Sequence, residues 1–163
     1  MRRLLVAGVV VCAVSNTAHA DDDPPFTIGS RPAWILLGGV TTGGTIALAD
    51  RGALVGGELS LARLSNSNVV GVYADAYYDW GANGTYMTGG IELARKFFGV
   101  DGGAALRFAD GERDLGVTGR ISVGLGVVSL YGRYMYFTDT MANEHVIQIG
   151  LLLKLPLLTV GGS

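Results

Sequence analysis

The stretch VVGVYADAYYDW, residues 69–80, decides the fold. Its residues alternate between an apolar set that includes Val70, Val72 and Ala74 and a second set that includes Tyr73 and Asp75. Alternation with period two over twelve residues predicts a β-strand. A soluble barrel would turn the aspartate face towards water, whereas an outer-membrane barrel would turn it inwards. The rest of the chain has to decide between these two orientations.

The N-terminal segment MRRLLVAGVVVCAVSNTAHA, residues 1–20, has the pattern of a secretory signal peptide. Arg2 and Arg3 precede an apolar run from Leu4 to Val14, and Ala18-His19-Ala20 forms a cleavage site of the small-x-small type. The run is shorter than the roughly 20 residues that a transmembrane helix needs. We therefore expect Sec-type export with cleavage near Ala20; the alternative is a retained amphipathic anchor.

Cleavage would leave a chain with little capacity for metal or thiol chemistry. Cys12 would be lost with the signal peptide, and His145 would be the only remaining histidine. We therefore expect no cofactor, no metal site and no cysteine nucleophile. Without Arg2 and Arg3, ten basic residues stand against fourteen acidic ones, a formal net charge of −4, which argues against a nucleic-acid partner.

The composition is too poor in charge for a typical soluble domain. Charged residues make up 16% of the chain, against about 25% in an average protein. Yet the 26 glycines interrupt the apolar runs, so that none after residue 20 is long enough for a membrane-spanning helix. Closed β-structure is the remaining way for such a chain to meet lipid.

Turn-like segments divide the rest of the chain into eight candidate strands. We predict a flexible periplasmic lead-in over residues 21–33, a barrel over residues 34–157 and a C-terminal tail over residues 158–163. The strands match the roughly 9–11 residues of a tilted membrane-spanning strand, and an even number allows antiparallel closure. The predicted ranges are 34–47, 53–64, 69–80, 85–97, 102–109, 115–125, 128–137 and 145–155.

The polar face of these strands mixes a few charges with Gly, Ala, Ser and Thr. Such a mixture suits the interior of an eight-stranded barrel, which is just wide enough for side chains. We predict a charge network in the lumen, with Tyr73, Tyr77 and Tyr131 beside it, and expect Asp79 at a strand end to be wet. We interpret the network as a structural plug, and the alternative is a gated pore or proton path. Its members are Glu58, Asp75, Glu92, Arg107, Arg120, Arg133 and Lys154.

Aromatic residues gather near the predicted strand ends, as in the girdles of membrane barrels at both lipid interfaces. With a periplasmic N-terminus, Trp34 and Phe97 fall at the inner rim and the others at the outer rim. The predicted fold is therefore an all-β, eight-stranded, antiparallel, up-and-down transmembrane β-barrel. The predicted girdle is Trp34, Tyr78, Trp80, Tyr86, Phe97, Phe108, Tyr134 and Tyr136.

This pattern resembles the small eight-stranded outer-membrane barrel families of Gram-negative bacteria, of the OmpA-transmembrane-domain and OmpX type. The resemblance covers Trp34 to about Leu157 and rests on alternation, not on a diagnostic motif. It implies an outer-membrane location, in contact with membrane lipid and lipopolysaccharide. The C-terminus, KLPLLTVGGS, departs from these families, which usually end the last strand with an aromatic residue that the insertion machinery reads.

We expect a non-enzymatic protein with a structural or envelope-interaction role and a non-conducting lumen; no protein partner is indicated. One alternative is a lipid-modifying outer-membrane enzyme that uses His145 at the outer rim. That site is weak, because no serine follows His145, and Thr140 and Glu144 are poor substitutes. The other alternative is a soluble periplasmic lipid-binding barrel with an apolar interior.

Overall fold

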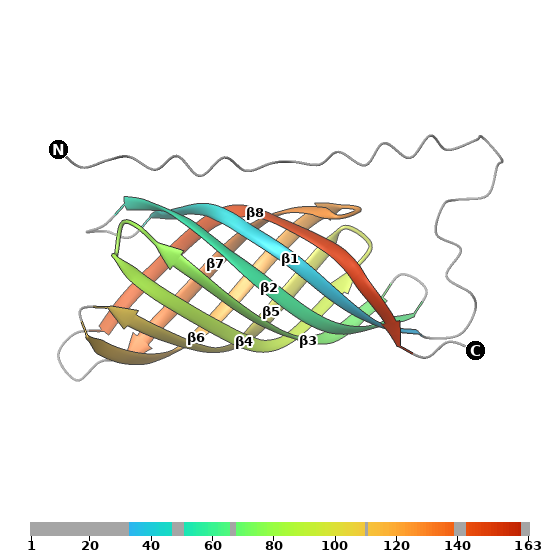
Figure 1. The fold of residues 1–163 in the computed structure, drawn as a ribbon, viewed down its shortest axis with the longest axis horizontal. Coiled ribbons are helices and arrows are strands. Elements are labelled where there is room, and N and C mark those ends of the chain that lie inside the picture. Colours follow the sequence, from blue (N-terminus) through green and yellow to red (C-terminus); the bar gives the residue numbers. More distant parts are fainter. Residues whose placement is uncertain (1–32, 47–50, 66–67, 110, 139–142, 161–163) are drawn as a thin grey trace.

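The structure, a computed structural model, describes residues 33–46, 51–65, 68–109, 111–138 and 143–160. Each strand pairs antiparallel with the next, and β1 pairs with β8 to close the barrel, as Figure 1 shows. The predicted eight-stranded antiparallel barrel is confirmed. The strands are β1 (Ala33–Ile46), β2 (Arg51–Ser65), β3 (Asn68–Asp79), β4 (Gly84–Arg95), β5 (Phe98–Ala109), β6 (Glu112–Leu125), β7 (Val128–Thr138) and β8 (Asn143–Val160).

We call the end of the barrel where β1 begins and β8 ends the terminal end, and the opposite end the loop end. The predicted signal peptide with its cleavage site near Ala20, residues 21–32 of the lead-in and residues 161–163 of the tail lie outside the described residues. The last strand is longer than predicted, since Leu158 and Val160 pair with Leu36 and Trp34 of β1. Within the described ranges, no helix is long and apolar enough to cross a membrane.

The pairing of β1 with β8 contains a register shift, at which β8 has one residue more than β1. Leu37 pairs with Pro156 and Leu36 with Leu158, so that Leu157 has no partner on β1. Proline has no N–H to donate to a neighbouring strand, and it is tolerated in sheets where the ladder is interrupted. The shift leaves the consecutive side chains of Leu157 and Leu158 both exposed on the outer wall.

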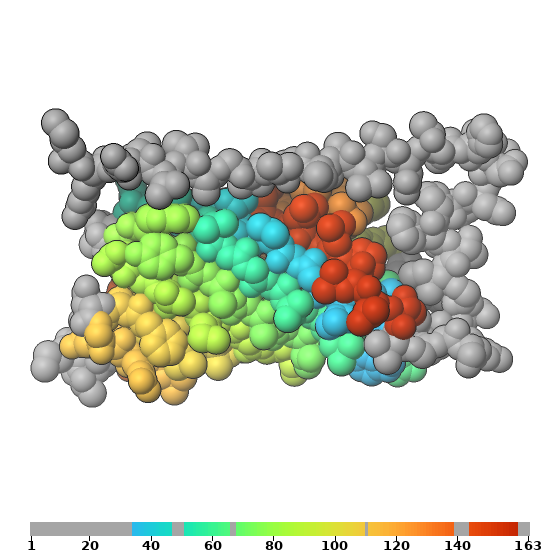
Figure 2. Space-filling view, in the orientation of Figure 1, coloured from blue at the N-terminus to red at the C-terminus, as the bar shows by residue number. Residues whose placement is uncertain are grey.

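The strand alternation places polar side chains inside the barrel and apolar ones outside. In β3, Tyr73 and Asp75 are buried in the lumen, whereas Val70 and Val72 are exposed. On the face in Figure 2, the side chains of β8, β1 and β2 form adjoining oblique bands. Exposed apolar side chains come from every strand, among them Val40, Leu59, Val72, Ile91, Val100, Ile121, Leu130 and Leu151.

Glycines on the lumen side make room for the aromatic rings of the interior. A Cβ added to Gly56 would collide with Cα and Cβ of Tyr77, its partner on β3. Gly57 faces the other way, and the nearest atom to an added Cβ there is the Gly39 carbonyl oxygen at 3.6 Å. The same cross-strand pairing of an inward glycine with an inward aromatic recurs as Gly90 with Tyr73, Gly116 with Phe137 and Gly150 with Tyr131.

Neighbouring glycines of β2 provide a matched test of this steric constraint. Gly56→Ala should lower the free energy of unfolding by about 1–3 kcal/mol, the usual effect of overpacking a filled interior. Gly57→Ala should leave it unchanged or raise it slightly, because alanine restricts the unfolded chain. Urea titration of barrels refolded into vesicles measures both values. Equal effects of the two substitutions would contradict the inward orientation of Gly56.

Candidate functional site: the ion-paired lumen

Arg120 on β6 is the centre of the charge network in the lumen. Its Nη1 donates to Glu58 Oε2 at 2.5 Å, and its Nε donates to Asp101 Oδ2 at 2.6 Å. Its guanidinium also lies over the ring of Tyr73, 5.1 Å from the centroid. The side chains of Arg120, Glu58 and Asp101 are nearly inaccessible to solvent. An arginine that bridges two strands in this way links β2 to β5 and β6 across the narrow interior.

Arg133 on β7, the next basic residue, pairs with Asp75 on β3. Its Nη2 donates to Asp75 Oδ2, and Thr88 Oγ1 donates to Asp75 Oδ1 at 2.6 Å. Among the described residues, Nε and Nη1 of Arg133 have no hydrogen-bond partner. The guanidinium instead lies over the rings of Tyr77 and Tyr131, at 5.0 and 5.6 Å from their centroids. Ring quadrupoles stabilise a desolvated cation in this position.

Lys154 on β8 completes the network towards the terminal end. Its Nζ lies 2.6 Å from Glu58 Oε1 and 2.5 Å from Glu92 Oε2, and it also donates to Ser60 Oγ at 2.9 Å. Glu58 therefore bridges Lys154 and Arg120. Arg120 Nη1 also lies 3.8 Å from Asp75 Oδ2, which joins the Arg133 pair to the rest. Four carboxylates and three cations thus form one connected group that spans β2 to β8.

An apolar and aromatic layer lies between this network and the loop end. Met135 and Phe137 come after Arg133 on the same, inward face of β7, and both side chains are fully buried. The rings of Tyr77 and Tyr86 stack with centroids 5.2 Å apart, and Tyr86 also contacts Phe137. The layer consists of Leu54, Tyr77, Tyr86, Ala105, Met135, Phe137 and Val146.

The assignment of Tyr86 to the outer girdle is wrong, because its side chain is 0% exposed and belongs to this inner layer. Tyr86 shares its face of β4 with Thr88 and Glu92, both buried, whereas Met87 and Ile91 point outwards. Its position close to a strand end resembled that of a girdle residue, but strand parity decides the direction of the side chain.

Arg107 on β5 lies in the lumen but at the loop end, apart from the network around Arg120. Its Nε donates to Asp114 Oδ2 at 2.7 Å, and Nη1 donates to Glu144. The guanidinium lies over the ring of Phe137, 5.0 Å from the centroid. The structure thus divides the seven predicted network residues into six that are connected and one, Arg107, that forms a separate ion-paired group above the apolar layer.

The sequence led us to expect a solvent-exposed Asp79, and this prediction is wrong. Asp79 is 0% exposed. Its carboxylate accepts hydrogen bonds from the Thr45 hydroxyl and from the backbone N–H groups of Gly81 (2.8 Å) and Ala82 (3.3 Å). It is the last residue of β3 and faces the lumen, where it caps the following turn. Polar groups at such a position are satisfied locally and need no cationic partner.

The sequence analysis missed three acidic residues of the lumen, each of which lies one position before a predicted strand: Asp101, Asp114 and Glu144. The reason is that β5, β6 and β8 begin earlier than predicted. The signal was present in the alternation, since Asp101 shares its parity with Arg107, and Asp114 shares its parity with Arg120. Cross-strand pairing of Asp101 with Arg120 and of Arg107 with Asp114 follows once the strands are extended.

The remaining girdle residues lie on the outer wall. Trp34 and Phe97 are exposed at the terminal end. At the loop end, Trp80 packs edge-on against Tyr78, with ring centroids 5.4 Å apart. Phe108, Tyr134 and Tyr136 also point outwards on β5 and β7.

His145 lies exposed on the outer wall between two tyrosines. Its Nδ1 is 2.6 Å from Tyr134 Oη, and its ring centroid is 5.1 Å from that of Tyr136. Among the described residues, no Ser, Thr, Asp or Glu oxygen bonds the His145 ring. The described ranges likewise hold no group of three or more His, Cys, Asp or Glu side chains that could bind a metal ion. The geometry is that of an exposed aromatic cluster on the outer wall.

These features define a small closed β-barrel with an ion-paired interior and an apolar outer wall. No protein-family model and no curated protein matches the sequence. Among solved structures, the chain is similar to the Yersinia pestis outer membrane protein Ail in a phospholipid bilayer nanodisc, with 10% identity, 73% of this chain and 99% of that chain covered, and a TM-score of 0.47. It is also similar to Neisserial surface protein A, with 13% identity, 76% and 97% coverage, and a TM-score of 0.42. The fold assignment rests on the strand pairing of the chain itself.

Removal of a buried cation should destabilise the barrel strongly. Arg133→Met removes the cation that is hydrogen-bonded to Asp75 and leaves only Arg120, whose Nη1 lies 3.8 Å from Asp75 Oδ2, as a charged neighbour. We expect a loss of about 3 kcal/mol in the free energy of unfolding, the lower end of the usual range for a broken buried pair. Arg113→Met is the matched control, because Arg113 is exposed on the outer wall over the Phe108 ring and should contribute at most about 1 kcal/mol. Unfolding of refolded barrels in detergent measures both.

A double variant separates loss of the pair from loss of packing. Asp75→Asn combined with Arg133→Met removes both charges and should cost less than the sum of the two single substitutions. Strict additivity would show that Asp75 and Arg133 do not interact, contrary to their hydrogen bond.

Proposed function

We propose that this protein is a non-enzymatic outer-membrane barrel of a Gram-negative bacterium, with a structural or envelope-interaction role and a lumen that does not conduct. The signal peptide would export the chain through the Sec pathway, and membrane lipid and lipopolysaccharide would be its surroundings. The observation that carries the proposal is the distribution of polar and apolar side chains. Apolar side chains cover the outer wall, and ion pairs fill the interior.

The exposed wall favours lipid over water as the surrounding solvent. Ile121 is 68% exposed and Leu125 is 75% exposed, and similar side chains continue around all eight strands. Soluble monomers rarely expose apolar patches larger than a few hundred Å². A soluble lipid-binding barrel would need its apolar side chains inside, where this chain carries Glu58, Arg120 and Arg133. The soluble alternative is therefore disfavoured.

The layers of the lumen support a closed interior. An ion that entered from the terminal end would meet the network around Arg120, then the apolar layer with Tyr86 and Phe137, and then the ion pairs of Arg107. Hydrophobic constrictions stop ions because water leaves them. The interpretation as a structural plug is thus favoured over a gated pore or proton path.

The non-enzymatic part of the proposal is supported by the surroundings of His145. A catalytic histidine needs a nucleophile within hydrogen-bond reach, and the ring instead bonds the Tyr134 hydroxyl. Tyrosine and histidine side chains are suited to the polar boundary of a membrane, since one part of each is apolar and the other part is polar.

Fractionation tests the location. We expect the full-length chain, expressed in a Gram-negative host, to appear in the outer-membrane fraction and to resist carbonate extraction. Its mobility on gels should change on heating, because a barrel stays folded in cold detergent. Release by carbonate together with a soluble, heat-insensitive product would overturn the proposal.

Planar-bilayer recording tests the closed lumen. The wild-type barrel should give no stepwise currents, whereas Tyr86→Ala combined with Phe137→Ala, which empties much of the apolar layer, should allow them. Folded insertion of both proteins is verified by heat-dependent gel mobility. Discrete steady currents from the wild-type barrel would show that the lumen conducts.

A further inference from the structure

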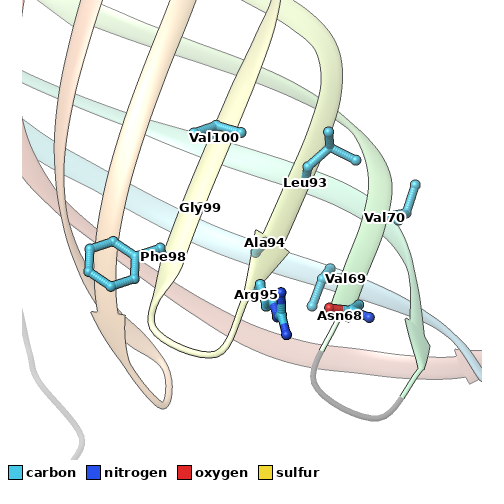
Figure 3. A pocket seen from close by; sticks show the side chains of 9 residues that line it. All are labelled: Asn68, Val69, Val70, Leu93, Ala94, Arg95, Phe98, Gly99 and Val100. Carbon is cyan, nitrogen blue, oxygen red and sulfur yellow. The ribbon is translucent and has the colours of Figure 1, made fainter.

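The outer wall carries a groove at the terminal end, across β3, β4 and β5. Its volume is about 440 Å³, and Figure 3 shows its lining residues. Asn68, Arg95 and Phe98 lie near the hairpin ends, while Val70, Leu93 and Val100 lie farther along the strands.

Two rows of outward side chains form the groove, and a row of inward-facing residues forms its floor. Asn68 pairs with Arg95, and Arg95 pairs with Phe98, which gives the row at the rim. Val70, Leu93 and Val100 are paired in the same way and give the deeper row. The floor between them is Val69, Ala94 and Gly99, which are partly buried and share the opposite parity. Because the side chains of these three residues point away from the outer surface, the wall is low along the groove.

Basic side chains accompany the apolar lining. Arg95 stands at the rim, and Lys96 follows it in the turn to β5. Arg63 on β2 is exposed and pairs with Val70, so that it flanks the deeper row. None of the residues that line the groove is acidic, and the neighbouring Asp101 points into the lumen towards Arg120. A positive rim beside an apolar groove is complementary to a lipid with an anionic headgroup.

We propose that this groove binds an anionic phospholipid, with an acyl chain along the apolar row of Val70, Leu93 and Val100 and the headgroup phosphate near Arg95 and Arg63. The inference rests on the proposed function, since an acyl chain reaches the wall only when the barrel is in a bilayer. With a periplasmic N-terminus, the terminal end faces the phospholipid leaflet and not the lipopolysaccharide. Basic residues near a membrane surface attract anionic lipids.

Trp34 provides a local reporter. It pairs with Arg63 on the neighbouring strand, so its backbone lies about 10 Å from Val70, two strand spacings away. Trp80 lies at the opposite end of the barrel, after β3, and Trp80→Phe leaves Trp34 as the only tryptophan of the chain. Brominated lipids quench tryptophan at short range, so quenching of Trp34 reports which lipid lies beside Arg63, at the edge of the groove.

The experiment compares vesicles of phosphatidylcholine that contain a minor fraction of brominated phosphatidylglycerol or of brominated phosphatidylcholine. In the Trp80→Phe background, we expect phosphatidylglycerol to quench Trp34 preferentially. Arg63→Gln and Arg95→Gln should each weaken the relative affinity about fivefold, as expected for one basic residue near a membrane surface. Arg113→Gln, at the loop end of the outer wall, is the matched control and should keep the preference.

A second pair of variants tests the groove itself. Leu93→Phe combined with Val100→Phe enlarges the side chains of the deeper, apolar row and fills the groove. It keeps all the arginines and should reduce the preference. If the preference persists in this variant, or if Arg113→Gln abolishes it as strongly as Arg95→Gln, the groove is not the binding site.

Heat-dependent gel mobility and protection from protease, measured on every sample, separate this inference from the proposed function. Equal quenching by the two lipids in a wild-type barrel that has inserted would overturn the groove and leave the membrane barrel intact. Failure of the wild-type protein to insert would overturn both.

Discussion

The narrow lumen is the constraint on which the rest of the structure depends. Eight strands enclose just enough space for side chains, and that space excludes bulk water. A charged group placed there is costly unless it is paired and hydrogen-bonded. Glu58 meets this condition by accepting hydrogen bonds or ion pairs from Arg120, Lys154 and Ser60 together. Since Arg120 lies on β6 and Lys154 on β8, whereas Glu58 lies on β2, these ion pairs also fix the arrangement of the barrel wall.

The same constraint explains where the glycines lie. A ring as large as that of Tyr131 fits inside only because Gly150, its partner on β8, has no side chain in its way. Tyr77 has an equivalent glycine partner, Gly56 on β2, whereas Gly90 on β4, the partner of Tyr73, allows the close approach of the β5 backbone at Gly102 and Gly103. These rings then lie beside the guanidinium groups of Arg120 and Arg133. Glycine in a strand usually weakens it, but here it makes the aromatic contacts of the interior possible.

Much of the fold could be predicted from the sequence, because a period of two is readable in each strand without knowledge of its neighbours. Alternation assigned Asp75, Arg120 and Arg133 to one side of the wall before any register was known. Alternation does not reveal where a strand begins, and Asp101 and Asp114 were misplaced for that reason. Alternation also does not reveal which inward residues lie at the same level along the barrel axis. That depends on the register, which separates Arg107 from the network around Arg120.

Residues of the outer surface can vary more freely than those of the interior, because the interior side chains hold the barrel together through shared contacts. Substitution of an inward residue leaves its hydrogen-bonding partners unsatisfied unless they change too. Asp75, for example, accepts hydrogen bonds from both Arg133 and Thr88. An outward substitution between apolar residues changes only a contact with the surrounding solvent. Features that break the apolar character of the wall therefore carry more information about function than the larger number of polar residues inside. Arg63 and Arg95 beside the groove, and His145 between its tyrosines, are such features. They lie at opposite ends of the barrel, so the two ends of the outer wall differ in chemistry: a groove flanked by arginines at one end, and a histidine between two tyrosines at the other.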